Sequence, residues 1–342
     1  MPNHIVALNS PDLLFQAASA LPYTLGFALE GSIVIAALSL SRDGVIRAGP
    51  CARLDLEDMP RLLTDGRQAL AVIVAHHPQG VMLVTFPRPG QSVSSQTDAL
   101  AAQLDTFVPV LGIVQVGARV RVVTDRGEES TFTREAFGST AAVASCIAEG
   151  RGVLPDVTAL AYPEANENAA DISVQTAVLP AIWDALAACG HGRPYDARAL
   201  EAAPMLGTYL DDAHARDSLI ADLLLAPKAR PRFTVRPLPE LHDILRSGPP
   251  RHPEECLGID RILRVLAARV SPQAHPRVCA LGAYVAWYSG HGALARILSD
   301  QALRTQADYT LARLIQESLA AGLLAPWRVV DRGEQRLESE PR

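Results

Sequence analysis

The sequence has a single lysine, Lys228, against 30 arginines, and aromatic residues make up only 5% of it. Its 31 basic residues are outnumbered by 37 acidic ones, for a net charge of −6. No overall positive charge therefore draws the chain to nucleic acid or to an anionic lipid surface. The longest apolar stretch, residues 32–40, is far shorter than the ~20 residues that span a bilayer. We expect neither a nucleic-acid-binding protein nor a membrane protein.

The five cysteines contain no C-x-x-C pair, which excludes a zinc knuckle and a thioredoxin-type motif. An odd, scattered set is typical of reduced and mostly buried thiols. Residues 1–8 carry no basic stretch, and Asp12 interrupts the apolar residues that follow, so no secretory signal is expected. These features predict a cytoplasmic protein.

Standard catalytic motifs are missing. The sequence has no G-x-S-x-G, no H-E-x-x-H and no P-loop. The adjacent His76 and His77 point to different faces of a helix, which favours a helix-end role over a metal site. His252-Pro253-Glu254 matches half of a zinc-deaminase signature, but the Pro-Cys-x-x-Cys half is absent. We expect no metal and no cofactor, and whether the protein is an enzyme stays open.

Residues 1–125 alternate between helical and strand patterns. Apolar residues at helical spacing predict helices over 11–21, 56–77 and 97–111. Apolar, β-branched runs predict strands over 32–40, 45–54, 81–86 and 113–124, with Asp43-Gly44 as a hairpin turn. Parallel strands need helical crossovers, so this order predicts an α/β domain with a mixed sheet.

The remainder of the chain shows no convincing strand. Residues 126–225 are expected to form a helical segment, with helices over 139–150, 175–189, 197–210 and 214–225. Residues 226–255 are rich in proline and basic, which predicts a stiff linker. A solvated tether is favoured over a nucleic-acid contact because Phe233 is its only aromatic residue. A helical segment over 256–328 and a frayed tail over 329–342 follow.

Two motifs compete around Gly290-His291-Gly292. With Ala295 these residues fit the G-x-G-x-x-A pattern of a dinucleotide-binding loop, which requires a preceding strand. The preceding residues continue a helical pattern instead. The small residues Ala283, Ala295 and Ala302 fall where a tetratricopeptide repeat places them. We favour a tetratricopeptide-like hairpin of helices at 276–289 and 292–305, packed on helices at 256–270 and 309–321.

Two sets of residues are candidate sites. Arg53 and Asp55 lie two apart at a strand end and so share a face of the sheet, which with Tyr23 makes a weak candidate ligand site. The structural alternative is an ion pair or a helix cap at Asp55, and we favour it. Trp287 and Tyr288, near the junction of the C-terminal helices, are the candidate partner surface.

Short motifs run in order along nearly the whole chain: Ser10-Pro11-Asp12-Leu13-Leu14, Leu21-Pro22-Tyr23, Leu25-Gly26-Phe27, Ser32-Ile33-Val34, Arg53-Leu54-Asp55, Ala215-Arg216-Asp217, Gly292-Ala293-Leu294-Ala295, Tyr309-Thr310-Leu311-Ala312 and Ala320-Ala321-Gly322-Leu323. In these motifs the sequence resembles the actinobacterial family called domain of unknown function 4192. Many members carry a cysteine- and proline-rich insert where residues 125–139 here have no cysteine. The resemblance implies a fold outline and a bacterial origin, but no mechanism.

Two functional hypotheses follow. In the first, the protein is a cytosolic interaction or regulatory module that binds a protein partner through its C-terminal helices. In the second, the α/β domain binds or converts a small molecule, and Arg53 holds an anionic group.

Overall fold

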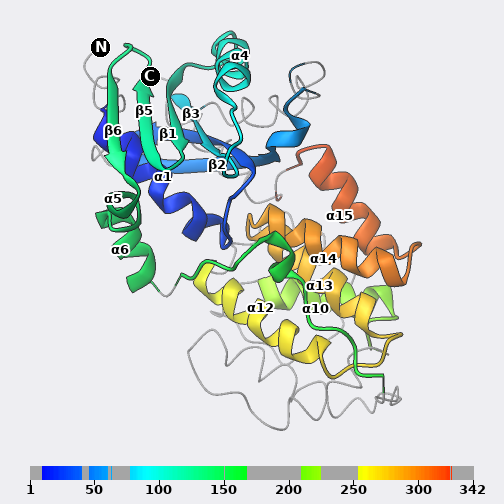
Figure 1. Cartoon of the computed structure of the whole chain (residues 1–342). Helices are drawn as coiled ribbons and strands as arrows, with labels where there is room; N and C mark the ends of the chain where they lie inside the picture. Colours follow the sequence, from blue (N-terminus) through cyan, green and yellow to red (C-terminus); the bar gives the residue numbers. More distant parts are fainter. Residues whose placement is uncertain are drawn as a thin grey trace, which may run out of the picture. The chain divides into compact units, whose positions relative to one another are not determined.

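The computed structural model describes residues 10–40, 46–60, 63, 78–149, 151–167, 209–224, 253–323 and 325. The chain forms two compact units, Met1–Asp156 and Val157–Arg342, which are called here the α/β unit and the helical unit. Each is described by itself, and both are drawn in Figure 1.

The α/β unit is built on one sheet with the strand order β2-β1-β3-β4-β5-β6. Strands β3 and β4 pair in parallel, and the other neighbours are antiparallel. The predicted mixed sheet is therefore confirmed. Its strands are β1 (Ser32–Leu40), β2 (Ile46–Asp55), β3 (Gly80–Phe86), β4 (Val110–Val116), β5 (Arg119–Thr124) and β6 (Glu129–Thr133).

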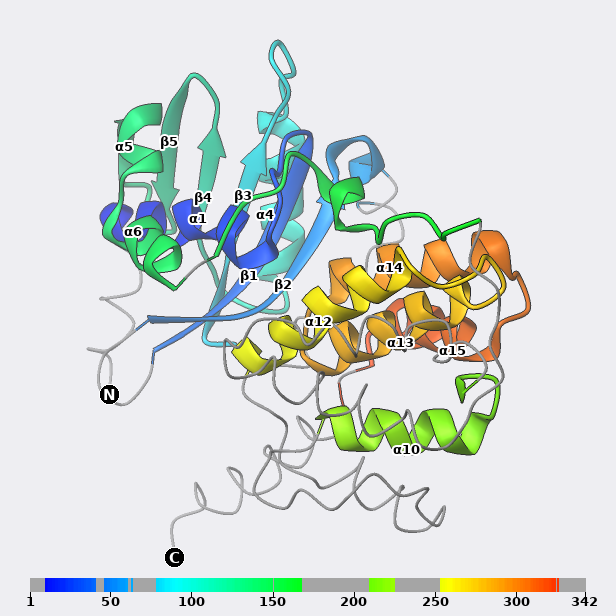
Figure 2. The same ribbon diagram turned by 90° about the horizontal axis from the view of Figure 1, so that it is seen from below.

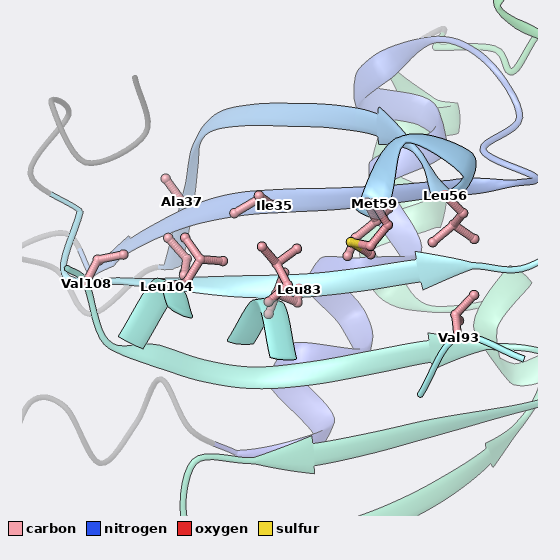
Figure 3. Close-up of a cluster of buried hydrophobic side chains, with 11 residues drawn as sticks. Ile35, Ala37, Leu56, Met59, Leu83, Val93, Leu104 and Val108 are labelled. Atoms are coloured by element: carbon pink, nitrogen blue, oxygen red, sulfur yellow. The ribbon is translucent and has the colours of Figure 1, made fainter. Parts of the chain in front are cut away.

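Helices cover both faces of this sheet. One face carries α4 (Ser94–Asp105), whose Leu100 and Leu104 join a buried cluster with Ile35 of β1 and Leu83 of β3 (Figure 3). The other face carries α1 (Pro11–Leu25) and α5 (Arg134–Gly138), and α6 (Ala141–Ala148) packs on α1. The glycine at position 112 of β4 lets α1 approach closely, because a Cβ there would lie 2.5 Å from Leu14 Cδ1.

The ends of α1 follow from its sequence. Pro11 begins the helix, where its missing N–H costs nothing. Gly26 ends it in the left-handed region at φ 87°, and its N–H donates to Pro22 O. The expected break at Pro22 is wrong, since this proline lies inside the last turn.

Several expected boundaries in the α/β unit are corrected. The helix predicted over 97–111 ends at Asp105, and β4 begins at Val110. The strand predicted over 113–124 is a hairpin of β4 and β5, because the chain turns back at Gly117, whose N–H donates to Arg119 O. The alternation of apolar and polar residues continues across this two-residue turn, so the sequence pattern does not reveal the turn. Strand β6 follows, so the unit extends to Asp156 rather than to residue 125.

The helical unit contains the C-terminal helices in the predicted order. They are α10 (Ala213–Leu224), α12 (Pro253–Ala267), α13 (His275–Tyr288), α14 (Gly292–Thr305) and α15 (Thr310–Ala320), after a 3-10 turn η3 (Val157–Leu160). Helices α13 and α14 form an antiparallel hairpin, α12 packs on α13, and α15 packs on both members of the hairpin (Figure 2). This confirms the expected packing.

The turn of the hairpin excludes one of the two motifs expected at Gly290 and is compatible with the other. A helix, not a strand, precedes it, so the dinucleotide loop is wrong. Gly290 has φ 87°, its N–H donates to Trp287 O, and the N–H of His291 donates to Ala286 O. These two bonds are the Schellman ending of a helix, in which the left-handed residue is usually glycine.

Some predicted segments lie outside the described residues. They are the helix over 175–189, nearly all of that over 197–210, and the tail over 329–342. Residues 226–252 of the predicted linker are also outside the described residues. The predicted linker extends to residue 255, but α12 begins at Pro253. Of the helix predicted over 56–77, the structure describes the 3-10 turn η2 (Leu56–Asp58) and a few residues after it. His76 and His77 are outside it.

The hairpin gives a first testable prediction. Ala295 has no exposed surface, and helix axes in contact lie only about 8–10 Å apart. We expect Ala295→Trp to overpack the α13–α14 contact and to lower the free energy of unfolding by about 1–3 kcal/mol or more. Urea unfolding measures it, with Ala320→Trp at an exposed position of α15 as the control. Equal stability of the two variants would contradict the hairpin.

Candidate functional site

Arg53 and Asp55, the first predicted pair, do come together at the end of β2. The Arg53 guanidinium contacts the Asp55 carboxylate through Nη2 at 2.5 Å and donates through Nε to Ser32 Oγ at 2.9 Å. Its carbon lies 5.8 Å from the ring centre of Phe27. The side chain of Asp55 is 50% exposed. Arg53 is thus already paired, and an anionic ligand would have to displace Asp55.

The predicted cap at Asp55 and a bond from Tyr23 to the pair are not found among the described residues. Asp55 is the residue before η2, yet no N–H of η2 donates to its carboxylate, so the expected cap is not formed. Among the described residues, no hydrogen bond or ion pair joins Tyr23 to Arg53 or Asp55. A second exposed pair follows on the same turn, where Arg88 donates to Glu57 at 2.6 Å. Two neighbouring ion pairs, Arg53–Asp55 and Arg88–Glu57, therefore stabilise this turn. We favour this structural role of Arg53 and Asp55, rather than the binding of a ligand.

Of the two residues expected at a partner surface, Trp287 is partly exposed and Tyr288 is buried. Tyr288 is 2% exposed and stacks on Tyr284 with ring centres 6.3 Å apart, so it belongs to the core. Trp287 is half-buried, and its Nε1 donates to Leu323 O at 3.1 Å. Successive residues of a helix point in directions about 100° apart, which explains why only one of the two can face outward.

Among the described residues of the helical unit, an extensive polar arrangement surrounds a short run of backbone, Leu160–Pro163, which is called here the Tyr162 segment. Gln301 of α14 accepts from the N–H of Tyr162 at 2.9 Å and donates to its carbonyl at 2.8 Å. Arg264 of α12 donates to the carbonyls of Leu160 and Ala161 at 2.7 and 2.6 Å. Side chains of two helices therefore bind the backbone where the chain leaves the 3-10 turn η3.

The side chain of Tyr162 fills a pocket between these helices. It is 3% exposed, and its hydroxyl donates to Asp260 Oδ1 at 2.8 Å. The Arg264 guanidinium lies 5.2 Å from the ring centre, within cation–π range. At Gly282 of α13 an added Cβ would fall 2.3 Å from the Tyr162 hydroxyl oxygen. The pocket is thus closed by a position that only glycine fits.

A cysteine and a histidine meet at the next residue of the segment. His275 Nε2 lies 2.8 Å from the carbonyl of Pro163, which can only accept, so this nitrogen carries the proton. Cys279 Sγ lies 3.6 Å from the other ring nitrogen, Nδ1. Burial raises the pKa of the Cys279 thiol to about 12. A fully buried thiol with a raised pKa is not an activated nucleophile, so the pair has a structural role.

Sequence reasoning missed every residue of this arrangement. One signal was present: Gln301 interrupts the apolar stripe of α14 at a position that helical spacing places inside. A buried glutamine needs partners for its amide. The identity of those partners was not readable, because Tyr162 lies 139 residues away in the chain.

The buried tyrosines predict how the stability of the helical unit depends on pH. Burial raises the pKa of Tyr162 well above its ordinary value, with a further contribution from the Asp260 charge. Burial also raises the pKa of Tyr284, and that of Tyr288 to about 12. Above pH ~10 the unfolded chain releases protons that the folded chain keeps, so stability falls as the pH rises, by up to about 1.4 kcal/mol per pH unit for each tyrosine.

Urea unfolding at pH 9, 10 and 11 measures this loss, and absorbance at 295 nm follows the tyrosinates. We expect part of the tyrosine signal of the native protein to appear only above pH 11, whereas in urea all of it appears near the ordinary pKa of about 10. A single native transition near pH 10 would contradict the buried positions.

The described part of the chain shows two further absences. No three His, Cys, Asp or Glu side chains there gather as metal ligands. No helix within it has the length and apolar character to cross a bilayer.

Comparison with known proteins identifies the family. A family model described as Domain of unknown function (DUF4192) matches residues 16–325. The chain belongs to this family. The match includes most of α1 and extends past α15, so this domain covers both units. No curated protein and no solved structure matches the chain. The DUF4192 description assigns no activity, so a function has to be argued from the geometry.

Proposed function

We propose that this DUF4192 chain is a protein-interaction module whose helical unit binds a short segment of polypeptide through its backbone. The observation that carries the proposal is the recognition of the Tyr162 segment. Side chains from α12, α13 and α14 satisfy five backbone groups of Leu160–Pro163 and enclose one aromatic side chain. Backbone hydrogen bonds that give affinity, together with a pocket that gives specificity, are the elements of peptide recognition.

The helices that form this surface support the proposal. Ala283, Ala295 and Ala302 are completely buried where α13 and α14 meet, as a tetratricopeptide-like hairpin requires. Helical repeats of that kind offer extended binding surfaces. A bacterial cytoplasm is part of the same proposal, and it is supported by the buried cysteines Cys146 and Cys279, which the structure leaves as thiols.

In this protein the surface holds its own chain. A covalently attached segment competes at an effective concentration on the order of millimolar, so a free peptide binds measurably only when the attached segment is weakened. The expected partner is therefore a protein with an accessible, tyrosine-bearing stretch that replaces the Tyr162 segment. Its backbone would take over the bonds to Gln301 and Arg264.

The test uses the full chain with Leu160→Ala and Tyr162→Ala combined, and a synthetic peptide copying residues 157–166. We expect the peptide to raise the melting temperature of this variant in a saturable manner and to leave the wild type unchanged. The same peptide with alanine in place of its tyrosine is the control. If the double variant is partly unfolded, peptide-induced refolding in circular dichroism reports the same binding. No stabilisation of either kind would contradict the proposal.

A further inference from the structure

A different place in the molecule, in the α/β unit, has the features of a ligand site. It lies where the parallel strands β3 and β4 end and where α4 begins. In folds with parallel strands, ligands bind at the carboxyl ends of those strands. Val93, the residue before α4, lies beside these ends (Figure 3).

The N-terminus of α4 is uncapped. No side chain of the described residues accepts from the N–H groups of its first turn, Ser94 to Gln96, and the first N–H groups of a helix have no partner within it. Together with the helix dipole they attract negative charge. Ser94 and Ser95 are exposed, so a ligand can reach these groups from solvent.

A buried hydroxyl points to a ligand independently of the helix. Thr85, the sixth residue of β3, is completely buried, and its Oγ1 finds no hydrogen-bond partner among the described residues. Its side chain lies on the α4 face of the sheet, because it follows Leu83 at the spacing of alternate strand residues. Buried hydroxyl groups are nearly always hydrogen-bonded, so one without a protein partner calls for an explanation.

Gln115 connects the strand ends with the helix. It is the register partner of Thr85 on β4, and its Nε2 lies 3.4 Å from Ser94 Oγ. Arg121 lies on its other side, with Nη1 3.5 Å from Gln115 Oε1 and an ion pair to Glu129. The Gln115 amide thus lies beside the first residue of α4, Thr85 lies in register with Gln115 on the neighbouring strand, and the Arg121 guanidinium lies next to Gln115.

We propose that the α4 N-terminus, Thr85 and Gln115 bind the phosphate or carboxylate group of a small molecule. The N–H groups of Ser94 to Gln96 and the Gln115 amide donate to the anionic oxygens. The Thr85 hydroxyl donates from beneath. This site differs from the one predicted at Arg53, where Ser32 and Asp55 already occupy the guanidinium.

The test is a titration of the full chain, labelled with 15N-serine, with inorganic phosphate. Sodium chloride at matched ionic strength is the reference. We expect the amide resonances of Ser94 and Ser95 to shift saturably with phosphate and not with chloride. Ser95→Glu places a carboxylate at the site and should abolish the Ser94 response. Ala99→Glu adds the same charge one turn later, at an exposed position, and should retain it.

The variant Thr85→Val tests the contribution of the buried hydroxyl by itself, because it leaves the N–H groups of α4 unchanged. We expect about tenfold weaker phosphate binding, which corresponds to one hydrogen bond to a charged group, with an unchanged or higher melting temperature. The proposal is overturned if Ser94 and Ser95 do not respond to phosphate, or if the response survives Ser95→Glu.

Discussion

Replacing Gln301 by methionine is expected to destabilise the protein more than any other conservative substitution in the helical unit. Methionine keeps the length of the side chain but removes both its donor and its acceptor. The N–H and the carbonyl of Tyr162 then stay buried without partners, at about 1–3 kcal/mol for each group. The expected loss is therefore about 2–6 kcal/mol in the free energy of unfolding.

Urea unfolding of the full chain measures the effect, and Gln306→Met is the matched control. Gln306 follows α14 and is only partly buried, so its substitution should change stability by less than about 0.5 kcal/mol. If Gln301→Met is as stable as the control, the Tyr162 segment is not held by Gln301, and the proposed recognition of backbone loses its basis.

The second large effect is expected for Gly282→Ala. One methyl group would lie 2.3 Å from the Tyr162 hydroxyl oxygen and 2.8 Å from two ring carbons. These contacts are too short for any real Cβ, so the ring or α13 must move. A forced shift of this kind in a packed core costs about 1–3 kcal/mol, and the bond from Tyr162 to Asp260 is lost as well. The sum is a loss of about 2–4 kcal/mol, once about 1 kcal/mol for that bond is included.

A double-mutant cycle shows whether the clash is the cause. In a Tyr162→Ala background there is no ring to displace, so Gly282→Ala should cost nothing, and alanine even favours the helix by about 1 kcal/mol over glycine. The expected coupling energy is therefore at least about 2 kcal/mol. Additive effects of the two substitutions would show that Gly282 and Tyr162 do not meet.

How far the sequence predicts the structure depends on how local each signal is. The hairpin at Gly290 was predictable because glycine, the helix periodicity and the buried alanines all lie within 30 residues. The mixed sheet was predictable from the order of helices and strands. The β4–β5 hairpin was not, because the turn at Gly117 keeps the alternation of the two strands continuous.

The candidate sites follow the same rule. Arg53 and Asp55 were predictable as a pair from their spacing of two on one strand. The Tyr162 segment was not, since its partners lie on three helices about 100 to 140 residues further along the chain. Nor was the site at α4, because the unpaired hydroxyl of Thr85 becomes visible only when every neighbour is in place.

The proposed recognition of polypeptide is tested most directly by replacing one hydrogen atom of the peptide by a methyl group, with the protein unchanged. The peptide copying residues 157–166 is compared with the same peptide N-methylated at its tyrosine, both against the Leu160→Ala, Tyr162→Ala full chain, by fluorescence anisotropy. Gln301 accepts from that N–H, so the methylated peptide should bind at least about tenfold more weakly, the effect of one lost hydrogen bond with its acceptor left buried. Equal affinity of the two peptides would contradict recognition through the backbone.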